Sequence, residues 1–316
     1  MIPLTLLRFR ISAERPIYFG DNPGSKIRGA LYEALRRVYD TGQAVYARTD
    51  YEANPVAWLL RLEERATSGG KDVPRPIAIR PPLVTSSAAC SFGITFFGSG
   101  RRCIPLVISA VHALQTMGIG RNRQSFRLEG VDSLDPLTGR ALPLLDSAGK
   151  VLNSLPDPPT QADVQARAAG FGQELTLHFL TPTQIVVAGH LLSEPAFLPI
   201  FQRLIERIRL LSENYLPKPI WVDADPLLSH ARIVTVVRQH LRWHTAWSHS
   251  RRTRKRLPIT GFVGSVTYNM VDPTLISWLL VGQSTQVGQN TIKGCGWYRI
   301  ADEDGTRATS RDSTPF

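Results

Sequence analysis

Histidine, arginine and tryptophan gather in residues 243–256 of this 316-residue chain, in the order WHTAWSHSRRTRKR. Cationic side chains release counterions from phosphates, and aromatic rings stack on unpaired bases, so this run predicts contact with RNA. The alternative is a solvated hairpin tip, because runs of charge usually face water. The candidate RNA-binding cations of the run are Arg251, Arg254, Lys255 and Arg256.

Two histidines of this run lie beside arginines and are candidates for proton transfer. Cleavage of RNA without a metal ion requires a base for the 2′-hydroxyl, an acid for the 5′-oxygen and cations for the charge on phosphorus. We expect His249 to act as acid or base with Arg252 as the stabilising cation, and His244 is the second candidate. The alternative for His249 is RNA binding alone. His240 and His244 have the spacing of two zinc ligands, but no glutamate follows His240, so we predict neither a metal site nor a cofactor.

The second stretch whose residues could bind a ligand is glycine-rich and covers residues 282–300, GQSTQVGQNTIKGCGWYRI. Backbone N–H groups at glycines can turn toward a ligand without a Cβ in the way, so such a loop can hold phosphates. A helix-like run precedes it and a strand-like run follows it, which is not the order of a dinucleotide-binding fingerprint. We expect an extended polyanion to lie here, and the candidate RNA contacts are Gly288, Gln289, Asn290, Lys293, Gly294 and Gly296.

Further arginines lie on a predicted helix and in a predicted turn. Residues 24–40 have an apolar stripe at helical spacing, and Arg28, Arg36 and Arg37 lie on the other face. Arg121 and Arg123 in the GIGRNR segment can grip a phosphate, or they are solvated arginines of a helix-capping turn. His178 and His190 are read as strand and loop residues without a catalytic role.

The composition favours a nucleic-acid partner. Lys and Arg number 37 against 26 Asp and Glu, which gives a net charge of +11 and a pI near 10.0. The planar guanidinium group of arginine can donate two parallel hydrogen bonds to a phosphate or to a base edge. The three cysteines have no paired spacing and indicate buried thiols in a reducing compartment. No apolar run approaches about 18 residues, so we expect a cytoplasmic protein without a membrane partner.

Hydrophobic periodicity predicts the same order of elements twice, β-α-β-β-α-β, the ferredoxin-like unit. The first set is strand 2–11, helix 24–40, strand 75–82, strand 90–97, helix 104–117 and strand 125–131. The second set is strand 174–179, helix 197–215, strands 233–237 and 261–270, helix 272–280 and strand 297–300. The fold class is therefore α+β, with tandem ferredoxin-like (RRM-like) domains and antiparallel sheets. We expect domains at 1–135, with an insertion at about 41–75, and at 171–302; residues 136–170 are a linker with a loose hairpin, and 303–316 are a flexible tail.

The glycine-rich stretch resembles the C-terminal loop of the repeat-associated RAMP proteins, and is most similar to that of the CRISPR precursor-RNA-processing endoribonucleases. The matching motifs are the V-G-x-x-T step at residues 287–291 and G-x-G-x-Y-x-I at residues 294–300. Residues 28–37, RGALYEALRR, resemble the first helix of that family. Many relatives carry a histidine in or just after this helix, whereas the matching position here is Glu33.

The resemblance implies a metal-independent endoribonuclease that cuts CRISPR repeat RNA 3′ of a stem and leaves a 2′,3′-cyclic phosphate. It also implies that the product, the mature crRNA, stays bound by its 3′ stem-loop in an effector complex with other Cas subunits. Arg28, Arg36 or Arg37 would complete the catalytic site across the domain cleft. Two alternatives remain open: a non-catalytic crRNA-binding subunit, and a structural RAMP subunit that caps the other end of the guide.

Overall fold

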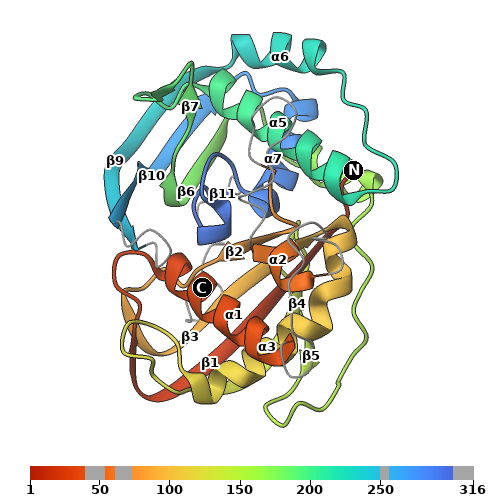
Figure 1. Cartoon of the computed structure of the whole chain (residues 1–316). Coiled ribbons are helices and arrows are strands. Elements are labelled where there is room, and N and C mark those ends of the chain that lie inside the picture. Colours follow the sequence, from red (N-terminus) through yellow and green to blue (C-terminus); the bar gives the residue numbers. More distant parts are fainter. Residues whose placement is uncertain (40–53, 61–72, 250–255, 302–316) are drawn as a thin grey trace.

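The computed structural model of the chain describes residues 1–39, 54–60, 73–249 and 256–301, without the side chains of residues 248, 249, 256 and 257. Within these ranges the chain forms two units of helices and antiparallel sheet. Figure 1 shows the N-terminal unit in red to yellow and the C-terminal unit in green to blue. No helix in these ranges is both long and apolar enough to cross a bilayer.

The N-terminal unit has a five-stranded sheet in the order β2-β3-β1-β4-β5. Helices α1 and α3 pack against each other over the face that carries buried Leu7 and Phe9, and alternation along β1 puts Arg8 and Arg10 on the opposite face. The elements are β1 (Leu4–Tyr18), α1 (Pro23–Tyr39), α2 (Pro55–Leu60), β2 (Ile77–Arg80), β3 (Ser86–Phe97), the short 3₁₀ helix η2 (Gly98–Cys103), α3 (Ile104–Met117), β4 (Arg127–Leu134) and β5 (Ala141–Leu145).

The C-terminal unit has a four-stranded sheet in the order β11-β6-β10-β9. Helix α5 packs on this sheet through Phe197, whose ring lies edge-on to Tyr268, and α7 receives a hydrogen bond from Tyr298 at the Leu279 carbonyl, 2.8 Å. The elements are β6 (Leu175–Thr183), β7 (Val186–Val187), β8 (His190–Leu191), α5 (Phe197–Tyr215), α6 (Ala224–Ile233), β9 (Thr235–His249), β10 (Arg256–Asn269), α7 (Pro273–Thr285), the 3₁₀ turn η3 (Thr291–Lys293) and β11 (Tyr298–Ile300).

Both sheets have the same strand order relative to the chain. In each unit the last strand of the β-α-β-β-α-β series lies beside the first, the first beside the third, and the third beside the second. This is the ferredoxin-like arrangement. The predicted α+β chain with tandem ferredoxin-like units is therefore confirmed, and helices α3 and α5 coincide with their predicted ranges.

The largest difference from the sequence prediction concerns β9. The prediction placed a strand at residues 233–237 and a connection after it, whereas α6 extends to Ile233 and β9 continues to His249, paired with β10 along its length. β9 is an edge strand with both faces largely exposed. Because it has no buried face, it lacks the apolar–polar alternation by which strands are recognised. In Figure 1, β9 and β10 run down the left side toward the N-terminal unit.

Residues 136–170, predicted to be a linker with a loose hairpin, contain β5 and the helix α4 (Gln161–Ala168). β5 extends the N-terminal sheet by pairing with β4. α4 begins after Thr160, whose side chain accepts a hydrogen bond from the N–H of Asp163, and it packs against α7 of the C-terminal unit. This segment therefore contributes to both units.

The glycine-rich loop packs against α1 and β2 of the N-terminal unit. A Cβ on Gly24 of α1 would lie 1.9 Å from the carbonyl oxygen of Lys293, and one on Gly294 would lie 2.7 Å from Pro81 Cδ. The buried Gln286 side chain donates a 2.6 Å hydrogen bond to the Ile79 carbonyl. Glycine at these positions therefore lets the two backbones meet. Asn22 caps α1 by accepting a 3.0 Å hydrogen bond from the Ser25 N–H through its side-chain oxygen.

Two further contacts join the units. Arg80 of β2 donates from Nη2 to the Gln283 carbonyl at 2.9 Å and to Ser284 Oγ at 3.0 Å, both on α7. Tyr215, the last residue of α5, donates from its hydroxyl to the Pro74 carbonyl. All of these groups are buried or nearly so, which makes the orientation of the two units a consequence of packing and not of a flexible hinge.

We expect Gly24→Ala to lower the free energy of unfolding by about 1–3 kcal/mol, because the added methyl meets a backbone carbonyl that cannot move aside cheaply. Gly29→Ala is the matched control on the same helix: its Cβ would meet nothing within 4 Å, and alanine favours a helix over glycine by about 1 kcal/mol, so it should stabilise the protein. Urea denaturation of the two variants measures both effects. Equal stability of Gly24→Ala and wild type would contradict the close packing described here.

Candidate nucleic-acid interface

The β9–β10 hairpin exposes two tryptophans on one side of its edge strand. Trp243 and Trp247 are 48% and 47% exposed, and register pairs them with Phe262 and Pro258 of β10. Trp243 also lies edge-on to the buried Phe262 ring at 6.2 Å. Large exposed indole faces held on a rigid strand are suited to stacking with unpaired bases.

The two histidine candidates occupy separate positions along β9. His244 pairs with Gly261, and His249 pairs with Arg256 at the end of the strand. Five residues of extended strand separate their backbones by about 16 Å. At this separation His244 and His249 cannot act as acid and base on the same phosphate, so they are alternative candidates. Arg251, Arg252, Arg254 and Lys255 lie outside the described residues, and for Arg256 the structure describes the backbone, which begins β10.

The three arginines of α1 have different surroundings. Arg28 donates from Nη2 to the Leu60 carbonyl at the end of α2, 2.8 Å, and is partly buried. Arg36 and Arg37 are exposed in the last turn of the helix. Arg28 thus contributes to packing in the N-terminal unit, whereas the side chains of Arg36 and Arg37 are exposed.

Glu33 forms an ion pair with Arg123, with 2.9 Å between Oε2 and Nη2. Arg123 lies in the turn between α3 and β4 with a φ of 48°. The same turn packs on β1, where the N–H of Arg121 donates to the Tyr18 carbonyl at 2.7 Å. Two arginines were predicted to bind a phosphate. Arg123 is paired with the carboxylate of Glu33, and the side chain of Arg121 is exposed.

The backbone of the glycine-rich loop is largely occupied by its own hydrogen bonds. The N–H groups of Gly294 and Gly296 donate to the carbonyls of Thr291 and Pro182, at 2.9 and 3.0 Å. Both glycines are buried and have positive φ, 80° and 74°. Their role in the described structure is to shape the chain. The more accessible loop positions are Gly288, Gln289, Asn290 and Lys293, of which Gln289 is exposed.

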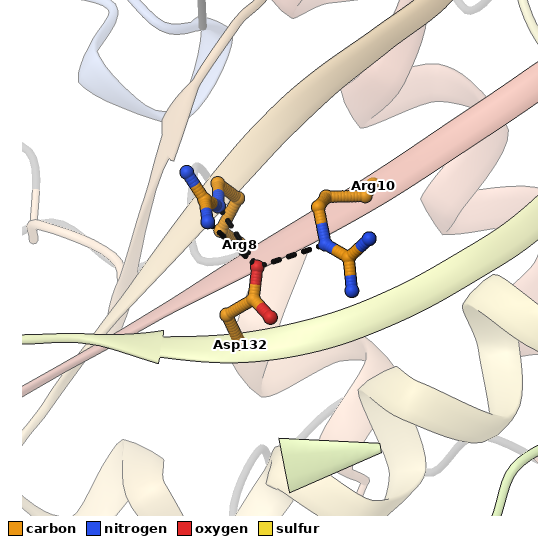
Figure 2. Close-up of polar contacts among 3 residues, drawn as sticks. All are labelled: Arg8, Arg10 and Asp132. Atoms are coloured by element: carbon orange, nitrogen blue, oxygen red, sulfur yellow. Dashed lines mark hydrogen bonds and ion pairs between the residues drawn. The ribbon is translucent and has the colours of Figure 1, made fainter. Parts of the chain in front are cut away.

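A cluster that the sequence prediction left out lies on the face of the N-terminal sheet away from the helices. Figure 2 shows Arg8 and Arg10 of β1 turned toward Asp132 of β4. Asp132 Oδ2 accepts from Arg8 Nε at 2.9 Å and from Arg10 Nε at 3.1 Å, and Asp132 is 2% exposed. The basic outer face of the first strand was visible in the sequence, but its pairing with a residue 122 to 124 positions away was not.

Arg80 is a second cation that periodicity did not single out. It is 7% exposed, and its guanidinium lies 5.4 Å from the centroid of the Trp297 ring. Arg299 lies at the same distance from that ring. Burial lowers the pKa of Arg80 to about 9, and the neighbouring Arg299 guanidinium is the second cause. The described residues hold no group of three or more His, Cys, Asp or Glu arranged around a common metal position.

Comparisons with known proteins agree with this architecture. Residues 177–298 match the family model of the CRISPR-associated endoribonuclease Cas6, and residues 2–156 match a model described as an N-terminal domain. The structure of Thermus thermophilus Cas6 (TTHB231) superposes with a TM-score of 0.57 at 16% identity, over 95% of this chain and 99% of that chain. A comparison with curated protein sequences gives no match.

Two other solved structures are similar. A partial Cas6-RT-Cas1–Cas2 complex matches with a TM-score of 0.60 at 14% identity, over 95% of this chain and 46% of that chain. A structure titled as a RAMP protein binding different RNA substrates matches with a TM-score of 0.51 at 12% identity, over 94% and 100%. The comparisons thus support a fold of two tandem ferredoxin-like units, which these solved structures share. Within the C-terminal part of the chain, residues 177–298 match the model of the Cas6 family, which is described as a CRISPR-associated endoribonuclease family.

We expect Trp247→Ala to weaken binding of single-stranded RNA about fivefold to 150-fold, because loss of one base–aromatic stack costs about 1–3 kcal/mol. Trp221→Ala is the matched control, since Trp221 is 83% exposed but lies between α5 and α6, outside the hairpin. Fluorescence anisotropy with a labelled oligonucleotide measures both. An equal loss in the two variants would show that the hairpin position has no special role.

Proposed function

We propose that this chain binds the repeat of a precursor CRISPR RNA and cleaves it to give mature crRNA. The match of residues 177–298 to the Cas6 endoribonuclease model is the observation that carries the proposal. The exposed tryptophans of β9, next to a run of cations, support it from this chain's own residues. One of the similar structures is titled a Cas6 (TTHB231) product complex.

The proposed reaction needs no metal ion and no water. A base takes the proton of the 2′-hydroxyl, the 2′-oxygen attacks phosphorus, and the bond from phosphorus to the 5′-oxygen breaks as an acid gives that oxygen a proton. The products are a 2′,3′-cyclic phosphate and a free 5′-hydroxyl. The mature crRNA then stays bound through its 3′ stem-loop, as part of an effector complex with other Cas subunits.

In this scheme His249 serves as acid or base with Arg252 as the cation that stabilises the pentavalent phosphorus. His244 is the alternative along the same strand. From the N-terminal unit, Arg36 and Arg37 have exposed side chains, whereas Arg28 is partly buried and would have to act beside its bond to the Leu60 carbonyl. In this proposal the C-terminal unit carries out the proton transfer, and the N-terminal unit supplies cations.

A second candidate function is a non-catalytic crRNA-binding subunit, and one observation favours it. Glu33 stands where many relatives carry histidine, and its carboxylate is already paired with Arg123. A carboxylate held by an arginine is a poor proton acceptor, because the pair stabilises its ionised form. The chain would then hold the guide while another protein cuts it.

Cleavage of end-labelled repeat RNA in EDTA, with enzyme in excess, separates the two functions. We expect wild type to cut, His249→Ala to cut about 10²- to 10⁴-fold more slowly through loss of proton transfer, and His190→Ala to match wild type as a control histidine on β8. Arg28→Ala should slow cleavage and also lower the melting temperature, because it removes the bond to α2.

Tight repeat binding with no product at enzyme excess would overturn the nuclease proposal and leave the binding subunit. Cleavage that stops in EDTA and returns with Mg²⁺ would contradict the metal-free mechanism. Products that carry a 3′-hydroxyl in place of a cyclic phosphate would contradict attack by the 2′-oxygen.

A further inference from the structure

Gln286, the residue at which α7 ends, has a backbone conformation that favours glycine. Its φ is 62° and its ψ is 173°. These angles are essentially confined to glycine, because a Cβ crowds the neighbouring backbone, and they cost free energy in any other residue. Gln286 is also fully buried. The chain therefore has a long polar side chain at a position where glycine would relieve the strain.

The last turn of α7 is anchored by arginines from two other elements. Arg80 of β2 donates from Nη2 to the Gln283 carbonyl at 2.9 Å. Arg207 of α5 donates from Nε to the Thr285 carbonyl at 2.7 Å. α7 has no basic residue in its own last turn, so these two arginines supply the positive charge that stabilises the C-terminal end of a helix.

The chain that follows Gln286 is anchored as well. The N–H of Val287 donates to the Gly296 carbonyl at 3.0 Å, within the glycine-rich loop, and Val287 is fully buried. Strained backbone angles persist only where the surrounding structure determines the path of the chain. Gln286 lies between two such fixed segments, which explains how it keeps its conformation.

The side chain of Gln286 reaches into the N-terminal unit. Its Nε2 donates to the carbonyl of Ile79 on β2, the edge strand of that sheet, at 2.6 Å. Its Oε1 is buried and has no donor among the residues that the structure describes. A strained backbone and a buried oxygen without a donor both cost free energy, so stability alone does not account for a glutamine here.

We propose that Gln286 is a positioning residue, which sets the orientation of the two units and through it the rate of RNA cleavage. This role rests on the RNA-processing function proposed above, in which cations of α1 and a histidine of β9 act on one phosphate from the two units. Gln286 is fully buried and does not touch RNA. A displacement of about 1 Å between reacting groups, caused far from the chemistry, can lower a rate about 10²-fold.

The test uses two substitutions that both remove the hydrogen bond to Ile79. Gln286→Gly also relieves the backbone strain, whereas Gln286→Ala keeps it. We expect both variants to cleave end-labelled repeat RNA at least about tenfold more slowly than wild type with the enzyme saturating, and to bind that RNA within about twofold of the wild-type Kd. The glycine variant should melt about 2 °C or more above the alanine variant. Gln165→Ala, at an exposed glutamine of α4, is the matched control and should match wild type in cleavage and melting.

A distance measurement tests the orientation directly. Nitroxide labels on Thr116→Cys of α3 and Gln202→Cys of α5 occupy exposed positions in the two units, and the three native cysteines are buried. Pulsed electron double resonance should give a shifted or broadened distance distribution in both Gln286 variants. The Gln165→Ala control should keep the wild-type distribution.

Wild-type distance distributions in both Gln286 variants would overturn the proposal. Cleavage that follows the melting temperature, slow in the alanine variant and normal in the glycine variant, would also overturn it, because the loss would then come from stability. Normal cleavage by both variants would overturn it and leave the nuclease function standing. A wild type that binds repeat RNA without cutting it would contradict the nuclease function, and a changed distance distribution would still support Gln286 as the residue that sets the orientation.

Discussion

The structure depends on a close approach of two backbones, that of the glycine-rich loop and that of the N-terminal unit. The loop reaches α1 at Gly24 and the chain just after β2 at Pro81, at distances that leave no room for a Cβ on Gly24 or Gly294. The buried Gln286 side chain fixes the same contact through the Ile79 carbonyl. Since glycine alone allows such an approach, the relative orientation of the two sheets depends on these positions.

This constraint changes how the glycine-rich loop is understood. A loop of this composition suggests backbone N–H groups turned toward a phosphate, yet Gly294 and Gly296 donate to carbonyls within the C-terminal unit. These two glycines therefore shape the turn of the loop and allow its close packing. The same packing brings the buried Arg80 of the N-terminal unit beside Trp297 and Arg299 of the C-terminal unit.

The distribution of charge separates two regions of the molecule. On β9, the exposed Trp243 and Trp247 lie on the same strand as His244, and large exposed indole faces are suited to stacking with unpaired bases. On α1, Glu33 neutralises Arg123, which leaves Arg36 and Arg37 as the exposed cations of that helix. The helix α1 therefore has a carboxylate, Glu33, at the position where the family resemblance leads one to expect a histidine.

Hydrophobic periodicity in the sequence was enough to predict the two β-α-β-β-α-β series and the helices α3 and α5, because buried apolar stripes repeat with the period of the element that carries them. It predicted a strand at residues 233–237 but not the extension of β9 to His249, since an edge strand with two exposed faces has no such stripe. The pairing of Glu33 with Arg123, the sharing of Asp132 by Arg8 and Arg10, and the meeting of Arg80 with Arg299 were decided by tertiary structure alone. Each joins residues 90 or more positions apart, and local periodicity carries no information about which distant strands become neighbours.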